Sequence, residues 1–278
     1  MKPNSRVLVA TDLSPSAEEA LRAGVRLAAD ARGPLAVIHV LPQVENGRRP
    51  ADIAGRVEEA IRERLRRCEA AQDVEVFVEE GPGHLPIVRR AEQWGAELIV
   101  VGARAASPLG HVFRGFGEQV VRDSHCPVLV VRPGHGHGGV LAATDLTKPS
   151  LPAVVAGAEE AERLGTHLRV VHAVGFLDIE ARYLLSLGKT YEGGSNDFAG
   201  LDEQLESAVA RLGIAPTCQV LDGPATRAIV EKARAMDAEL VVVAPRAKNG
   251  RSRAILRSVA EDVVRSAPCS VLVVRSPA

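Results

Sequence analysis

The sequence predicts two tandem α/β domains, each an open parallel five-stranded sheet flanked by helices. Three observations lead to this fold class. The chain of 278 residues is about twice a common domain length. Two stretches repeat each other closely, VLVATDLSPSAEEAL from Val7 and VLAATDLTKPSLPAV from Val140. Within each copy, Val- and Ile-rich runs alternate with longer runs of helical periodicity, which is typical of a parallel sheet covered on both faces.

The repeat continues in the same order along both halves of the chain. AELIVVGAR, from Ala96, corresponds to AELVVVAPR, from Ala238. CPVLVVR, from Cys126, corresponds to CSVLVVR, from Cys269. An internal repeat of this kind determines the architecture before any single residue is interpreted. We therefore predict a first domain over residues 1–133, a flexible Gly/His linker over 134–139 and a second domain over 140–278.

The first copy gives the order of elements. Aliphatic runs predict strands, and runs with apolar residues three or four positions apart predict helices. Ser14 and Pro15 suit a helix start, as the cap and the first helical residue. The predicted strands are 6–11, 35–41, 74–79, 97–101 and 127–132, and the predicted helices are 14–31, 51–71, 83–95 and 115–124.

Composition and charge exclude several classes of protein. The net charge of -1 argues against a nonspecific nucleic-acid-binding protein, because such proteins usually carry a basic surplus. No apolar run approaches the roughly 18 residues that cross a bilayer, and the N-terminus has no hydrophobic signal core. The cysteines show no CxxC spacing and indicate reduced, mostly packed thiols. We expect a cytoplasmic protein that binds neither nucleic acid nor membrane.

The first strand of each copy ends where a ligand would bind. Ligands of an open parallel sheet lie beyond the carboxyl ends of the strands, where the strand order reverses. Thr11-Asp12 and Thr144-Asp145 occupy this rim. Their carboxylates could accept hydrogen bonds from a ribose or a base, or hold a metal attached to phosphates. Alternatively, they fix the following turn through side chain to backbone hydrogen bonds. The repetition of ATDL does not decide between these roles.

The end of the fourth strand carries a family resemblance. VVGAR, a loop, a short helix and CPVLVVR resemble the universal stress protein (UspA-like) family of the adenine-nucleotide alpha-hydrolase-like group, and the resemblance covers the whole chain as a tandem member. It implies the strand order 3-2-1-4-5. It also implies that the two domains meet through their last strands, so that one chain imitates the family's homodimer, and two chains could associate further.

The resemblance implies a role in stress tolerance, and it raises the question of whether the protein binds a nucleotide. Some family members bind ATP or AMP with Mg²⁺ and hydrolyse ATP slowly. Those members carry G-x2-G-x9-G-(S/T) after the fourth strand, because glycines let backbone N–H groups approach phosphates. In the first copy Gly102 and Gly115 match, while Ala105 and Phe116 do not. In the second copy only the hydroxyl residue matches, and the four positions are Ala244, Ala247, Arg257 and Ser258.

A second alignment, made backwards from the last strand, is equally consistent. It pairs Arg114-Gly115-Phe116-Gly117-Glu118 with Arg257-Ser258-Val259-Ala260-Glu261, if the first copy has lost one loop residue. Both copies then carry arginine where phosphate-binding members carry glycine. These arginines could bind an anion directly or be solvated. The same two alternatives hold for Arg104 and Arg246, which follow the fourth strands.

Other candidates have simpler interpretations. His39 and His172 lie at matching positions in the second strands, and we expect them to be core residues with satisfied hydrogen bonds. Cys126 and Cys269 are expected to be packing residues. The second copy is longer within Gly175–Gly200, which carries both tyrosines and covers either a pocket or a core edge.

No catalytic motif is present. The sequence has no Walker loop, G-x-G-x-x-G, nucleophile elbow or H-E-x-x-H. We therefore expect no catalytic residue and at most a weak ATPase. A scaffold that binds a protein partner and no nucleotide is the remaining alternative. The candidate ligand contacts are Thr11, Asp12, Gly102, Arg104, Gly115, Asp145, Arg246 and Ser258.

Overall fold

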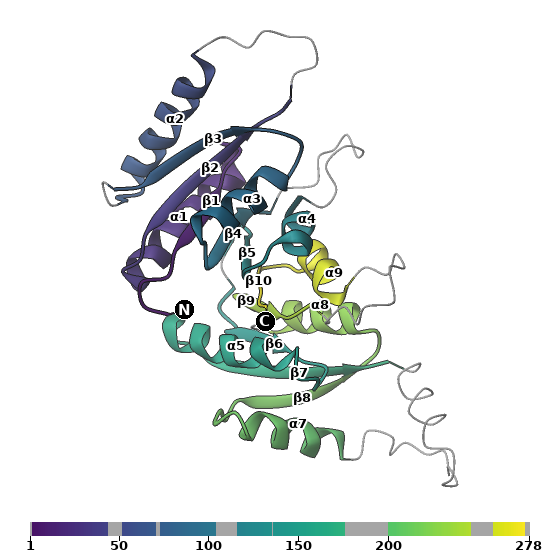
Figure 1. Ribbon diagram of the computed structural model, residues 1–278. Helices are drawn as coiled ribbons and strands as arrows, with labels where there is room; N and C mark the ends of the chain where they lie inside the picture. The colour runs from purple at the N-terminus through teal and green to yellow at the C-terminus, as the bar shows by residue number, and fades with distance from the viewer. Residues whose placement is uncertain are drawn as a thin grey trace. The chain divides into compact units, whose positions relative to one another are not determined.

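The chain folds into two compact units, Met1–Gly134 and His135–Ala278, which we call the first and second units. Figure 1 shows the elements of each in the structure, a computed structural model. The structure describes residues 2–43, 52–70, 73–103, 116–134, 136–175, 200–245 and 258–275.

The first unit is a five-stranded parallel sheet in the order β3-β2-β1-β4-β5. β1 lies at the centre, with Val9 opposite Val37 of β2 and Val100 of β4. This is the predicted order. The strands are β1 (Val7–Ala10), β2 (Leu35–Leu41), β3 (Glu75–Glu80), β4 (Leu98–Gly102) and β5 (Val128–Val131), and the helices are α1 (Pro15–Ala31), α2 (Ile53–Arg67), α3 (Leu85–Trp94) and α4 (Phe116–Asp123).

The second unit repeats this sheet in the order β10-β9-β6-β7-β8. Read from β8, it follows the same path through the chain as the first unit, so the predicted fold class is confirmed for both. The strands are β6 (Val140–Ala143), β7 (Leu168–Val174), β8 (Thr217–Asp222), β9 (Leu240–Val243) and β10 (Ser270–Val273), and the described helices are α5 (Leu151–Leu164), α7 (Leu201–Ala210), α8 (Ala225–Ala235) and α9 (Val259–Ser266).

Helices cover both faces of each sheet. α1 packs on β1 and β4, whereas α3 contacts α4; likewise α5 packs on β6 and β9, whereas α8 contacts α9. Right-handed crossovers place the first two helices of a unit on one face and the last two on the other (Figure 1). Alternate residues of a strand therefore face different helix pairs.

The central strands form the core. Every residue of β1 and of β6 is buried, and Leu8, Ile99 and Leu141 have no exposed surface. Burial on both faces explains why these strands read as continuous aliphatic runs. The rim beyond the carboxyl ends of β1 and β6 is where polar residues first appear.

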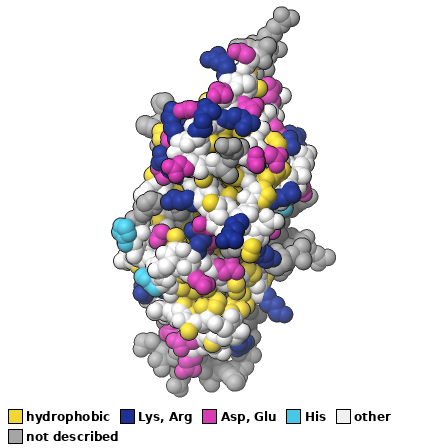
Figure 2. All heavy atoms as spheres, turned by 90° about the vertical axis from the view of Figure 1, so that its left-hand side faces the viewer, with side chains coloured by type: hydrophobic (Ala, Val, Ile, Leu, Met, Phe, Trp, Pro, Cys, Tyr) yellow, Lys and Arg dark blue, Asp and Glu magenta, His cyan; other side chains and the backbone are white. Residues whose placement is uncertain are grey.

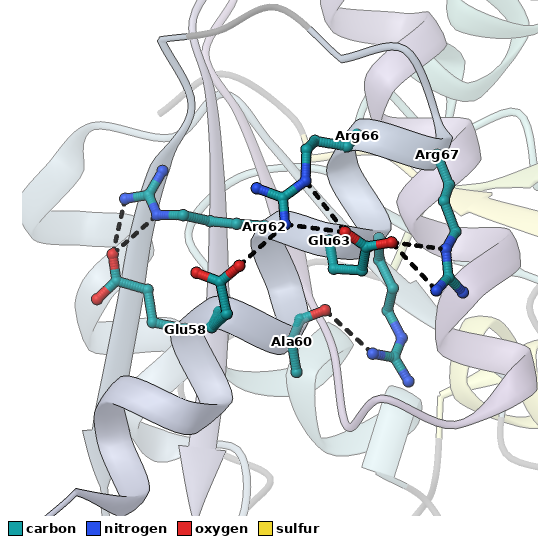
Figure 3. Close-up of polar contacts among 8 residues, drawn as sticks. Glu58, Ala60, Arg62, Glu63, Arg66 and Arg67 are labelled. Carbon is teal, nitrogen blue, oxygen red and sulfur yellow. Dashed lines mark hydrogen bonds and ion pairs between the residues drawn. The ribbon is translucent and has the colours of Figure 1, made fainter.

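The outward side of α2 carries a network of ion pairs (Figure 3). Arg62 binds Glu58 at 2.7 Å, and Glu63 binds both Arg66 at 2.8 Å and Arg67 at 3.2 Å. Hydrogen bonds from Arg66 and Arg67 lower the pKa of the Glu63 carboxyl. Exposed pairs of this kind contribute little to stability. On the face drawn in Figure 2, basic and acidic side chains are similarly interspersed.

The glycines before β6 are packed rather than free. Gly138 donates a backbone hydrogen bond to Asp237 O at 2.8 Å, and Glu239 donates one to Gly139 O at 2.9 Å. A Cβ atom on Gly136 or Gly138 would overlap carbonyl oxygens of the turn between α8 and β9. The expectation of a flexible linker is therefore wrong for residues 136–139: glycine is needed there because two backbone segments approach closely.

Candidate functional site

The turn after β1 is held by its own side chains. The amide of Ser14 donates to Asp12 Oδ1 at 3.0 Å, and the amide of Leu13 donates to Thr11 Oγ1 at 3.1 Å. Leu13 takes a left-handed conformation with φ of 64°, which an L-residue adopts only at a cost of about 1 kcal/mol. The turn-fixing role of Asp12 is thus shown, and its side chain is also exposed to solvent.

The turn after β6 has the same construction. The amide of Thr147 donates to Asp145 Oδ1 at 3.0 Å, and the amide of Leu146 donates to Thr144 Oγ1 at 3.0 Å. Leu146 also has a φ of 64°. A strained leucine at the same position in both units marks the rim as a place where conformation is imposed by its surroundings.

A histidine supports each rim from the neighbouring strand. His39 Nδ1 lies 2.9 Å from Thr11 O, and His172 Nδ1 lies 2.9 Å from Thr144 O. Because a carbonyl oxygen can only accept, Nδ1 carries the proton. Burial lowers the pKa of His39, although the hydrogen bond to Thr11 and the charge of Asp12 oppose this. The expected hydrogen bond is thus present for each histidine, and His172 is buried whereas His39 is half-buried.

The two rims differ at one buried position. Ser150 occupies in the second unit the place that Ala17 holds in the first. Its hydroxyl donates to Thr147 O at 2.9 Å, accepts from the amide of Asp145 at 3.2 Å and lies 2.7 Å from Thr144 Oγ1. Since the Ser150 proton is already used, the Thr144 hydroxyl must donate to it. The hydroxyl group of Ser150 is therefore saturated within the rim.

The first helices of the two units also start at different positions. α1 begins at Pro15, with Ser14 as the N-cap accepting from Ala17 N at 3.3 Å, as the sequence predicts. α5 begins only at Leu151, directly after Ser150. A hydrogen-bonded turn precedes α5, because the amides of Ser150 and Leu151 donate to Thr147 O at 2.9 and 3.3 Å.

Gly102, a predicted phosphate-loop residue, has a packing role. A Cβ atom there would lie 2.6 Å from Ser16 O, in the first turn of α1. In the second unit Ala244 stands at the corresponding position, and α5 begins later than α1 relative to the strand before it.

The ends of the helices after the loops support the second alignment. α4 ends at Asp123 and α9 at Ser266, each three residues before the cysteine that precedes the last strand, Cys126 or Cys269. Phe116 therefore corresponds to Val259, and Gly115 corresponds to Ser258. This correspondence is that of the second alignment, in which the first copy is one loop residue shorter.

Ser258 is the N-cap of α9. Its hydroxyl accepts from the amide of Glu261 at 3.2 Å and also contacts the Glu261 carboxylate at 3.3 Å. The bond from the Glu261 amide is an N-cap interaction, and the serine hydroxyl donates its own proton to the Glu261 carboxylate. A structural role therefore accounts for the serine that the sequence suggested as a phosphate contact.

Replacing Ser258 with alanine should lower the free energy of unfolding by about 1 kcal/mol, because an N-terminal amide of α9 loses its acceptor. Urea denaturation followed by circular dichroism measures the change. Ser258→Asp, which keeps an acceptor, should retain most of the stability. A Ser258→Ala variant as stable as the wild type would contradict the capping role.

The structure adds a residue that the sequence did not indicate. Arg64, in the last turn of α2, donates from Nη2 to Leu13 O at 3.4 Å and from Nη1 to Ala60 O at 3.0 Å. This places a cation next to the turn that holds Asp12. Nothing in the helical pattern distinguishes Arg64 from the neighbouring surface arginines, so sequence reasoning had no signal for it.

Several predicted residues lie outside the described residues. They include three candidate ligand contacts, the two loop arginines and most of the long loop with both tyrosines. Within the described ranges, no group of three or more His, Cys, Asp or Glu side chains could hold a metal ion. No helix in those ranges is long and apolar enough to cross a membrane. The undescribed candidates are Arg104, Arg114, Gly115, Arg246, Arg257 and residues 176–199.

Comparison with known proteins decides the family. The model of the universal stress protein family matches residues 3–132 and again residues 138–275. The chain belongs to the universal stress protein family. The two matches show that it is a tandem member, as the repeat predicts.

Two proteins with similar sequences are also universal stress proteins. A universal stress protein of Mycobacterium tuberculosis is 29% identical over 197 residues, which is 65% of this chain and 62% of the relative. The alignment thus spans less than two thirds of that relative's length. A universal stress protein of Methanocaldococcus jannaschii is 40% identical over 65 residues, covering 23% of this chain and 38% of the relative.

Solved structures share the fold. A universal stress protein from Archaeoglobus fulgidus aligns over 98% of both chains, with a TM-score of 0.66 and 20% identity. A further universal stress protein structure, described as a complex with cAMP, covers 47% of this chain with a TM-score of 0.40 and 24% identity. Ligand binding is a property of that protein.

Proposed function

We propose that this universal stress protein is a regulatory module that binds an adenine nucleotide at the rim of its first unit and not at the rim of its second. The observation that carries the proposal is the exchange of Ala17 for Ser150. Both units have the same strands and the same strained turn, so this exchange separates the two rims at a buried position.

The polar groups of the second rim form hydrogen bonds with one another. Ser150 bonds to the side chain of Thr144 and to the backbone at Asp145 and Thr147. A ligand hydroxyl would have to replace these bonds at the full desolvation cost of each group left unpaired. Asp145 is also half-buried, whereas Asp12 is exposed.

The first rim offers complementary groups. Asp12 presents a carboxylate that can accept from a ribose hydroxyl, as acidic residues at such sheet edges do. Arg64 lies beside Leu13 O and supplies a charge suited to a phosphate. In the second unit the corresponding carboxylate, Asp145, is half-buried, and no cation among the described residues bonds to Leu146 O as Arg64 bonds to Leu13 O.

We propose binding rather than turnover, because the sequence carries no catalytic motif. Slow ATP hydrolysis and a nucleotide-free scaffold for a protein partner are the competing functions. A cytoplasmic location and pairing of the two units through their last strands stay predictions.

Calorimetric titration with ATP and AMP, with and without Mg²⁺, tests the proposal. Ala17→Ser should weaken nucleotide binding about tenfold, because the added hydroxyl can bond to Thr11 and Asp12 as Ser150 does in the second unit. The matched control is Ser150→Ala, which should leave the affinity unchanged and cost the second unit about 1 kcal/mol of stability.

Three outcomes would contradict the proposal. No binding by the wild type, with or without Mg²⁺, would favour the scaffold. Release of ADP during the titration would favour an ATPase. Equal affinity in the wild type and Ala17→Ser would place the nucleotide elsewhere than the first rim.

A further inference from the structure

In the first unit, the charged side chains of β3 on the sheet face that α3 covers each have a partner on α3. Alternate residues of β3 each meet a partner on α3: Trp94 Nε1 donates to Glu75 at 2.7 Å, and the Arg90 guanidinium stacks 4.4 Å from the centre of the Phe77 ring. Glu79 binds Arg90 at 2.5 Å and Arg89 at 3.1 Å. Arg90 therefore has both an aromatic and an anionic partner.

The corresponding face of the second unit has lost these partners. β3 and β8 each have six residues, and the turns that follow α3 and α8 are equivalent, so Lys232 of α8 corresponds to Arg90. Gln219 stands where Phe77 stands in the first unit, and Leu221 stands where Glu79 does. The positive charge is retained, but its aromatic and acidic neighbours are not.

A second cation has been added at the same place. Arg169 of β7 is paired in register with Thr217 of β8 and replaces Ala36 of the first unit. Its Nε atom is buried without a hydrogen-bond partner. α8, which carries Lys232, packs on β7 and β8, and Arg169 lies on the same face of the sheet as its register partner Thr217. In keeping with this placement, burial and then the charge of Arg169 lower the pKa of the Lys232 ammonium.

No carboxylate neutralises this pair among the residues that the structure describes. Glu231, next to Lys232 on α8, is bound to Arg227 at 2.7 Å. Asp202 and Glu206 act on Cys218, whose side chain alternates to the other face of β8. Two adjacent, partly desolvated cations without a counter-charge are unfavourable unless an anion joins them.

We propose that Arg169 and Lys232 form an anion site on the α8 face of the second unit, which binds a small tetrahedral oxyanion such as phosphate. Arginine supplies a planar pair of donors and lysine a point charge, the combination that phosphate groups use. Thr217, which is exposed, and Gln219, which is half-buried, lie on the same face of β8 as neutral donors. This site does not depend on nucleotide binding at the first rim.

Thermal unfolding and calorimetric titration of the full chain with inorganic phosphate test the site, with sodium chloride at equal ionic strength as the reference. Phosphate should raise the Tm of the wild type more than chloride does. Arg169→Met and Lys232→Met should each raise the Kd for phosphate at least about tenfold. Arg227→Ala, which removes a cation from the same helix, should leave the Kd unchanged.

The variants also separate a binding role from a structural one. Without phosphate, Arg169→Met should melt at or above the wild-type Tm, because it removes repulsion between like charges. If Arg169→Met does not fold, Lys232→Met gives the same comparison. Equal phosphate affinity in the wild type and the foldable variants, or a wild-type Tm shift no larger than that from chloride, would overturn the proposal.

Discussion

Replacing Gly138 with alanine is expected to unfold the second unit at urea concentrations that leave the wild type folded. The added Cβ would overlap the carbonyl oxygen of Met236, and backbone atoms cannot move aside as a flexible side chain can. Relief requires breaking the hydrogen bond from Gly138 to Asp237 O. We expect a loss of about 3 kcal/mol in the free energy of unfolding, at the upper end of overpacking effects.

Two probes distinguish the units in this experiment. Trp94 is the chain's single tryptophan and lies in the first unit, so its fluorescence reports on that unit, whereas circular dichroism reports on both. Hydrogen exchange should become faster in β6 and β9. The control is Gly55→Ala in α2, where nothing lies within 4 Å and stability should rise by about 0.5–1 kcal/mol. A Gly138→Ala variant with wild-type stability would contradict this packing and would support a flexible linker over residues 134–139.

Gly102→Ala should destabilise the first unit by about 2 kcal/mol. The new Cβ would lie 2.6 Å from Ser16 O and 2.8 Å from its carbonyl carbon, so β4 and the first turn of α1 must separate. The Trp94 fluorescence transition in urea measures the change in the unit concerned.

The reciprocal change in the second unit is the matched control for Gly102. Ala244→Gly should cost at most about 1 kcal/mol, through the greater backbone entropy of glycine in the unfolded chain. If Gly102→Ala left stability unchanged and only weakened nucleotide binding, Gly102 would be a phosphate contact rather than a packing residue.

The repeat was sufficient to predict the sheets, because strand burial leaves a direct mark on composition. Continuous aliphatic runs such as VLVA and VLAA occur where a strand is buried on both faces, and the helix start at Ser14-Pro15 follows from capping chemistry. The predicted residue ranges of the strands and of the first helix, which rest on these local signals, agree with the structure.

The site was harder to predict because its residues act across the fold. Ser150 matters through hydroxyl contacts with Thr144 and Asp145, and its counterpart Ala17 is an unremarkable helix residue. The sequence left two alignments open before α4, and the matching ends of α4 and α9 favour the one with the shorter first loop. Arg64 and Arg169 resemble ordinary surface arginines until their neighbours are seen.

The most direct test of the asymmetry between the two rims is the stoichiometry of nucleotide binding. Calorimetric titration of the full chain with ATP and Mg²⁺ should give one site per chain, and that site should be weakened in Ala17→Ser and retained in Ser150→Ala. Two equivalent sites per chain, or a site lost in Ser150→Ala, would contradict the account, since the exchange at this position would then not separate the two units.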